Sequence, residues 1–477
     1  MAESARTFLK RFLGFSIGPL VSSVIGFFTV PITTWFIMPD EFGKASMYAL
    51  ASTFLAMIIF MGMDQAFARE FHARTDKKTL YFNAVLIPLS LSIIASFFIL
   101  IFYKPFSMLL YASVQLDAMI MLAVSLPVSV FYRFNLLLIR MQERARLYSL
   151  LNILDRVLGF TFLMLFIFLY EKSFKSIVLA NFCSYISISA INVALTSDYF
   201  KKGVHIDKAL LKVLVKFGLP LIPTSLLAWV FESMDRIAMR QWSDFIQIGL
   251  YSGAFKIVTV LQLFSSAFNT FWAPTVYRWY ETNVEKDLFH KVSTVLFGMM
   301  SICFAFIVLF RNIIIMLLSK SYAGSAVLVP FLIYIPIMYT TSETTGMGIG
   351  FTRKTSYSII VSGVSAGINF IGNYLLVPKY GALGACISTA VSYMSFFWVK
   401  TMISRKLWWK FNLKPYILNS FFMGVYSFIT LFTNNFFLEL PLALLILIYN
   451  FPSIKYIYAV AFNKKRGTDH ENTSCHF

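Results

Sequence analysis

The sequence predicts an all-α polytopic membrane protein, and three observations support this prediction. Of the 477 residues, 58% are hydrophobic, 18% are aromatic and only 13% are charged. Soluble domains carry about 25% charged residues, so there is too little charge here to coat a soluble surface. The apolar residues fall in runs of about 20, the length that a membrane-spanning helix needs. Lys and Arg gather in alternate connections between these runs.

Fourteen apolar runs are predicted to be transmembrane helices. Only helices and closed barrels satisfy the backbone hydrogen bonds in lipid, and runs of this length are helices. The connections between them are too short to hold a soluble catalytic domain. The runs are 12–37, 44–66, 80–102, 115–139, 147–170, 175–197, 213–235, 246–272, 290–310, 324–349, 355–376, 382–403, 416–434 and 438–460.

The distribution of basic residues predicts the orientation in the membrane. Of the 41 Lys and Arg residues, 29 lie in the terminal segments and every second connection, and 8 lie in the opposite connections. Cytoplasmic connections carry the excess of Lys and Arg, so both termini are predicted to be cytoplasmic. The same asymmetry explains the net charge of +19 without a nucleic-acid partner.

Matching residues recur at an interval of about 206–209 and predict an internal repeat. Two six-helix halves in the same orientation follow from it, with an extra helix pair at the end. The predicted parts are an N-terminal lobe at 1–200, a C-terminal lobe at 201–410, and helices 13–14 with a cytoplasmic tail at 411–477. The matched residues are Gly43 and Gly249, Arg69 and Arg278, and Ser184-Tyr185 and Ser392-Tyr393.

Prolines near the start of each half are predicted to break the helices at corresponding places. Pro19 and Pro220 lie in the first span of each half. Proline removes a helix hydrogen bond, and paired helix breaks are typical of a transport path. Ordinary tolerance of proline in membrane helices is the alternative explanation.

Several kinds of chemistry find no support in the sequence. No phosphate-binding Gly-Lys-Ser/Thr loop is present, so ATP-driven transport is not expected. No cofactor and no metal site are expected, because the histidines lie in connections or the tail and the cysteines lack metal or disulfide spacing. The cysteines, predicted to be structural, are Cys183, Cys303, Cys386 and Cys475.

Charged residues inside the apolar runs are the candidate functional residues. A charge at the bilayer centre costs about 2.5–3.5 kcal/mol on insertion scales, so such residues usually face a cavity or a partner. Four cations and five acids qualify: Arg133, Arg156, Arg236 and Lys256, with Asp64, Asp155, Glu232, Asp235 and Glu343.

Depth in the membrane ranks the cations. Arg156 and Lys256 each lie about ten residues into a span, about 15 Å deep at about 1.5 Å per residue. They are predicted to form the centre of a partly cationic cavity that binds an anionic substrate. Arg133 and Arg236 are predicted to extend this site toward either side of the membrane. A structural ion pair is the alternative role for each cation.

The acids are predicted to balance charge or to couple an ion. Glu232 and Arg236 are four residues apart, which favours an ion pair on one helix face. Asp155 is expected to balance an adjacent arginine. Asp64 and Glu343 lie near cytoplasmic ends, where they reach interfacial water or bind a coupling ion.

Motifs across the whole chain resemble one transporter family. The seventh and eighth spans carry Ser233-Met234-Asp235-Arg236, then GLYSGAFK at 249–256, then Phe-Trp-Ala-Pro at 271–274. GMDQAFARE at 62–70, GMGIGFTRKT at 346–355 and the segment 377–393 fit the same pattern. The sequence resembles the Wzx-type polysaccharide-unit flippases of the multidrug/oligosaccharidyl-lipid/polysaccharide exporter superfamily.

The resemblance implies a substrate, a location and partners. The substrate would be an oligosaccharide unit on a polyprenyl diphosphate such as undecaprenyl diphosphate. It would be moved from the cytoplasmic to the outer leaflet of the bacterial inner membrane, for O-antigen of lipopolysaccharide, capsule or exopolysaccharide. A polysaccharide polymerase and chain-length machinery would be partners, and Na⁺ or H⁺ is the candidate coupling ion.

Three other functions stay open. A multidrug or cation antiporter of the same superfamily would carry net acidic charge in its lumen, whereas here four cations face five acids. A lipid II flippase of this superfamily fits the same features. A membrane polysaccharide polymerase is less consistent with the short connections of this sequence, because such enzymes usually need a large outward-facing loop with polar catalytic residues.

Overall fold

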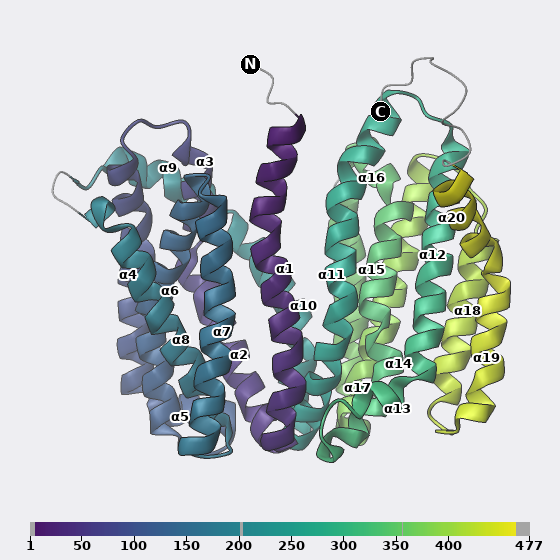
Figure 1. Ribbon diagram of the computed structural model, residues 1–477, viewed down its shortest axis with the longest axis horizontal. Coiled ribbons are helices and arrows are strands. Elements are labelled where there is room, and N and C mark those ends of the chain that lie inside the picture. The colour runs from purple at the N-terminus through teal and green to yellow at the C-terminus, as the bar shows by residue number, and fades with distance from the viewer. Residues whose placement is uncertain (1–4, 201–203, 355, 464–477) are drawn as a thin grey trace. The chain divides into compact units, whose positions relative to one another are not determined.

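The structure is a computed structural model that describes residues 5–200, 204–354 and 356–463. Within these residues the secondary structure is entirely helical (Figure 1), which confirms the predicted fold class. The elements are α1 (Ala5–Phe36), α2 (Pro39–Phe60), α3 (Met63–Phe71), α4 (Lys77–Ile101), α5 (Tyr103–Tyr111), α6 (Leu116–Met141), α7 (Ala145–Leu169), α8 (Phe174–Leu195), η1 (Ser197–Phe200), α9 (Lys208–Gly218), α10 (Leu221–Trp242), α11 (Phe245–Glu281), α12 (Lys286–Leu309), α13 (Arg311–Ile315), η2 (Lys320–Val327), α14 (Val329–Leu332), α15 (Tyr334–Thr345), α16 (Met347–Phe351), α17 (Ser356–Leu407), α18 (Lys414–Ile429), α19 (Phe436–Tyr449) and α20 (Phe451–Asn463).

The predicted spans fall on these helices. Ten helices are long and apolar enough to cross a membrane, or twelve if each of two bent helix pairs is one span, among the described residues. The two predicted spans at 355–376 and 382–403 are both in α17, which is broken at Gly381, where φ is 54° and ψ is −129°. The predicted span 416–434 corresponds to α18, which has 16 residues. The protein is therefore a multi-pass membrane protein.

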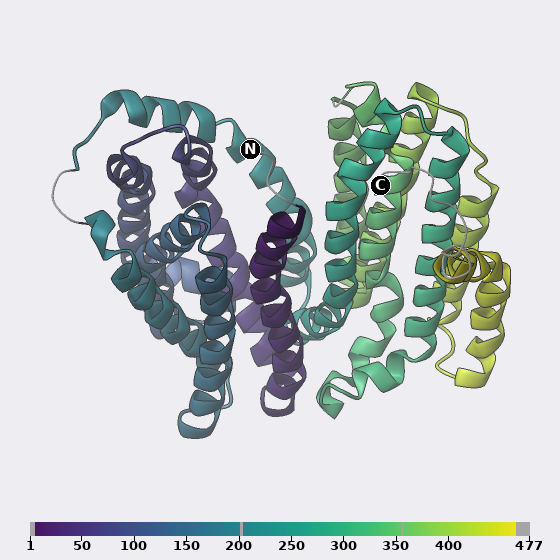
Figure 2. The same cartoon turned by 45° about the horizontal axis from the view of Figure 1, so that its top comes forward.

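One predicted span, 213–235, lies within the candidate span Lys208–Trp242 but contains a break between two helices. The apolar run 213–235 straddles two helices, because α9 ends at Gly218 and α10 starts at Leu221. Pro220 is the residue before α10, and its missing N–H suits a helix start. The α9 helix buries Leu210 and Leu214 and exposes three lysines on the opposite side, at 208, 212 and 216. Figure 2 shows α9 running across the ends of the neighbouring helices.

The predicted pair of proline breaks is also not found. Pro19 lies inside α1, which continues to Phe36. Pro220 instead lies between α9 and α10. The difference arises because a proline inside a membrane helix is tolerated, whereas Pro220 lies two residues after Gly218, where the preceding helix has already ended.

Contacts divide the chain into two units, Met1–Ser252 and Gly253–Phe477. In the first unit α7 packs against α1 and α8, and α6 packs against α4 and α8 (Figure 1). In the second unit α15 packs against α17, and α12 contacts α15, α18 and α19. The lobe boundaries expected at 200/201 and 410/411 stay predictions, and the tail at 464–477, which contains Cys475, lies outside the described residues.

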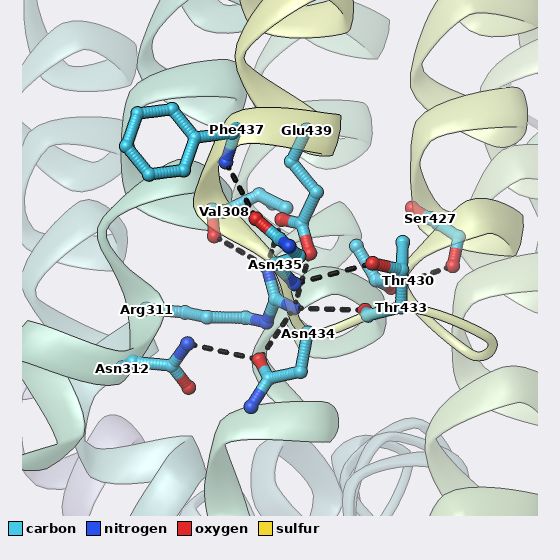
Figure 3. A network of polar contacts seen from close by, with 10 residues as sticks. All are labelled: Val308, Arg311, Asn312, Ser427, Thr430, Thr433, Asn434, Asn435, Phe437 and Glu439. Carbon is cyan, nitrogen blue, oxygen red and sulfur yellow. Dashed lines mark hydrogen bonds and ion pairs between the residues drawn. The ribbon is translucent and has the colours of Figure 1, made fainter.

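Within the second unit, a buried ion pair joins the extra helix pair to the helices before it. Arg311, at the start of α13, is 1% exposed and pairs with Glu439 of α19. Its guanidinium also donates to the Val308 carbonyl at 2.9 Å and to the Asn434 side chain at 3.0 Å (Figure 3). The network satisfies a charge that would otherwise be costly to bury, and it ties the end of α12 to α19.

Candidate functional site

The first unit contains a group of charged side chains in and beside its membrane-spanning helices. Asp64, in the first turn of α3, is buried, and Arg133 lies on α6. The Arg133 Nη2 and Nε atoms both donate to Asp64 Oδ2, at 2.8 and 3.1 Å. The structure therefore pairs two of the predicted residues that are 69 positions apart.

A second acid lies close to this pair but is bound by neutral groups. Asp155 of α7 accepts hydrogen bonds from Ser184 of α8 at 3.0 Å and from the Tyr132 hydroxyl of α6 at 3.3 Å. Tyr132 stacks on Tyr185, with ring centroids 4.6 Å apart. The expectation that Asp155 balances the charge of an adjacent arginine stays a prediction.

Arg156 is the next residue on α7 and its side chain is exposed. It lies eleven residues after the start of α7, about 17 Å along the helix axis at about 1.5 Å per residue. Tyr185 is within electrostatic range of Asp155, Arg133 and Arg156. Arg133 and Arg156 therefore both lie near the stacked pair of Tyr132 and Tyr185. Asp64, Arg133, Tyr132, Asp155, Arg156, Ser184 and Tyr185 are called the first-unit polar cluster below.

The predicted residues on α10 are arranged differently from the expectation. Asp235 is buried and accepts a hydrogen bond from Tyr251 at 2.7 Å. Arg236 donates to the main-chain carbonyl of Glu232 at 3.4 Å, where an ion pair with the Glu232 carboxylate was expected. The four-residue spacing does place the two side chains on one face, but it does not decide which oxygen is bound.

The second unit holds the remaining predicted residues. Lys256 lies eleven residues after the start of α11, and its side chain is exposed. Glu343 of α15 pairs with Lys400 of α17 at 2.6 Å, which the sequence-based interpretation missed because Lys400 was assigned to a connection. The expectation that Arg156 and Lys256 share one site stays a prediction.

The tyrosines and Ser184 were not among the predicted site residues. The signal that could have found two of them is the recurrence of Ser184-Tyr185 as Ser392-Tyr393. Among the described residues, no three His, Cys, Asp or Glu side chains gather as metal ligands.

Comparison with solved structures shows which fold the chain has. The fold matches the lipid II flippase MurJ in an inward closed conformation with a TM-score of 0.70, at 14% identity over 94% of this chain and 99% of that chain. It matches an inward-facing multidrug resistance MATE family transporter of the MOP superfamily at 0.59, with 16% identity over 83% of this chain and 97% of that chain. At these identities the likeness shows the fold, which is that of membrane flippases and transporters.

The family follows from the sequence comparison. Residues 8–279, more than half of the chain, match the family described as polysaccharide biosynthesis protein. The chain therefore belongs to this family. A search of curated proteins found no match.

Proposed function

We propose that the protein flips a polyprenyl-diphosphate-linked oligosaccharide from the cytoplasmic to the outer leaflet of the bacterial inner membrane. The observation that carries this proposal is that Arg133 and Arg156 are exposed within membrane-spanning helices near one tyrosine pair. A guanidinium facing hydrocarbon is costly, so these exposed groups require a polar surrounding or an anionic ligand.

A diphosphate is the ligand that such a site suits. Guanidinium groups bind phosphate oxygens through two parallel charge-assisted hydrogen bonds, and their charge offsets the desolvation of the anion. The prenyl chain can remain in lipid while the head group crosses. The family description supports a carbohydrate substrate.

The transport cycle is proposed to be alternating access driven without nucleotide hydrolysis. Two repeated halves of the same orientation can rock against each other and so open the central site to either side of the membrane. An ion gradient of Na⁺ or H⁺ is the proposed energy source. A polymerase and its chain-length machinery would then use the exported unit.

The test is surface polysaccharide in a strain that lacks its own flippase and expresses variants of this protein. Arg156→Ala and Lys256→Ala are each expected to abolish the polymer while the protein still reaches the membrane. Arg140→Ala is the matched control, because Arg140 lies in the last turn of α6 and reaches interfacial water. Full complementation by both alanine variants would contradict the proposed site.

The likeness to MurJ favours a second candidate substrate. That protein is a lipid II flippase, which makes lipid II the second candidate substrate for this chain. Reconstituted protein should therefore be offered both lipids. Flipping of lipid II alone would replace the proposed substrate with this one.

A further inference from the structure

We propose that Asp64 is a positioning residue, which holds the Arg133 guanidinium as a preformed ligand for the diphosphate group of the substrate. The inference rests on the proposed function and deepens it, because it assigns diphosphate recognition to a particular ion pair. It also accounts for the burial of an acid beside an exposed cation.

The two members of the pair differ in exposure. The Asp64 side chain is 9% exposed, whereas the Arg133 side chain is 57% exposed. The acid is thus enclosed by the protein and the guanidinium is presented outward.

The hydrogen bonds leave much of the guanidinium available. Nε and Nη2 of Arg133 both donate to Asp64 Oδ2, and Oδ1 accepts the main-chain N–H of Gln65 at 2.9 Å. A guanidinium has five N–H groups. Two are used in the described part of the chain, so three remain to bind oxygen atoms of a ligand.

The backbone around Asp64 fixes the direction of the carboxylate. Met61 and Gly62 adopt positive φ, 47° and 68°, so the chain turns between α2 and α3. A Cβ on Gly62 would lie 2.8 Å from the Gly218 carbonyl oxygen, so the turn is packed tightly against α9. Asp64 follows in the first turn of α3, where the helix N-terminus stabilises a carboxylate.

The surroundings of Arg133 add a second cation for the same ligand. Arg156 lies within electrostatic range of Tyr132 and Tyr185, and Arg133 lies within range of Tyr185. Asp155 is held by hydroxyl groups and so does not compete for Arg133. With Asp64 and Asp155 the first-unit polar cluster carries no net charge, and two arginines offer donors to a diphosphate.

The experiment measures binding of farnesyl diphosphate and farnesyl monophosphate to the purified full-length protein in detergent. Arg133→Ala removes charge-assisted hydrogen bonds, so farnesyl diphosphate is expected to bind about 10- to 100-fold more weakly. Asp64→Asn keeps the Arg133 cation but weakens the hydrogen bonds that hold it, so an affinity for farnesyl diphosphate about 3- to 10-fold weaker is expected. The monophosphate should be affected less by either change. Asp117→Asn is the control, because it breaks the Lys175 ion pair elsewhere in the same unit.

A charge-swapped variant separates positioning from a structural role. Asp64→Arg combined with Arg133→Asp retains an ion pair but places the cation on α3, where it is buried. We expect this variant to restore protein abundance and thermal stability relative to either single change, while diphosphate binding stays weak. Restored binding in the swapped variant, or unchanged binding in Asp64→Asn and Arg133→Ala, would overturn the inference and leave the proposed function standing. A wild-type protein that binds neither farnesyl phosphate would instead contradict both.

Discussion

Gly43 of α2 and Gly249 of α11 pack directly against each other's helix. A Cβ on Gly249 would lie 1.8 Å from the Pro39 carbonyl oxygen, and a Cβ on Gly43 would lie 2.1 Å from the Phe245 carbonyl oxygen. The two glycines also occupy matching positions of the internal repeat, 206 residues apart. Close helix packing therefore explains why glycine occurs at both positions.

Replacing Gly249 by alanine is expected to destabilise the first unit. The added methyl group would collide with main-chain atoms, and overpacking of this kind costs about 1–3 kcal/mol or more. Thermal melting of the detergent-solubilised protein measures the effect. Gly26→Ala is the control, because nothing lies within 4 Å of a Cβ there and alanine is the better helix former. Equal melting temperatures for the two variants would disprove the close packing.

Breaking the Arg311–Glu439 pair is expected to be strongly destabilising. Arg311→Met or Glu439→Leu alone leaves one buried charge without its partner, at a cost of about 3–5 kcal/mol. The double variant removes both charges and should recover most of the loss. Unfolding curves of the single and double variants test this. Additive losses in the double variant would show that the two side chains are not coupled.

Asp76 is expected to stabilise the start of α4 in a pH-dependent manner. Its carboxylate accepts the main-chain N–H groups of Lys78 and Thr79 at 3.2 and 3.0 Å. The nearby Thr79 hydroxyl and these N–H groups lower the pKa of Asp76 from its ordinary value of 3.8. The stabilisation is therefore present above pH 3.8 and is lost as the pH falls through the lower pKa of the folded protein.

Hydrogen exchange at Lys78 and Thr79 measures this cap. Asp76→Ala should speed exchange at neutral pH, by an amount equivalent to about 1 kcal/mol. Asp76→Ser keeps an oxygen that can cap the helix but has no carboxylate to titrate. Protection of the Lys78 and Thr79 amides in this variant should therefore not change with ionisation at position 76. Equal protection in the alanine variant and the wild type would rule out the cap.

The predicted orientation can be tested by cysteine labelling in intact cells. In a cysteine-free background, single cysteines at Lys172 and Lys320 are expected to react with an impermeant thiol reagent. A cysteine at Lys208 should react only after the membrane is opened. The reverse pattern would invert the topology, and labelling at all three positions would indicate damaged cells.

The sequence by itself determined that the chain is helical and which charged residues were candidates for a function. Apolar runs of about 20 residues leave the backbone no alternative to helix in lipid, so fold class could be predicted without any long-range contact. Charges within such runs are rare and costly, and this made Arg133, Arg156 and Asp64 candidates directly. Hydropathy did not reveal the break between α9 and α10 inside the predicted span 213–235, where Gly218 contacts the turn at Gly62.

Only the tertiary structure decided which charges are partners. Asp64 and Arg133 are 69 residues apart, and Arg311 and Glu439 are 128 apart. Pairings over such separations depend on which helices are neighbours and how each is rotated, and the apolar pattern of a single helix carries neither. The same holds for the exposure of Arg133 beside a buried Asp64, because burial is a property of the packed helices and not of either residue alone.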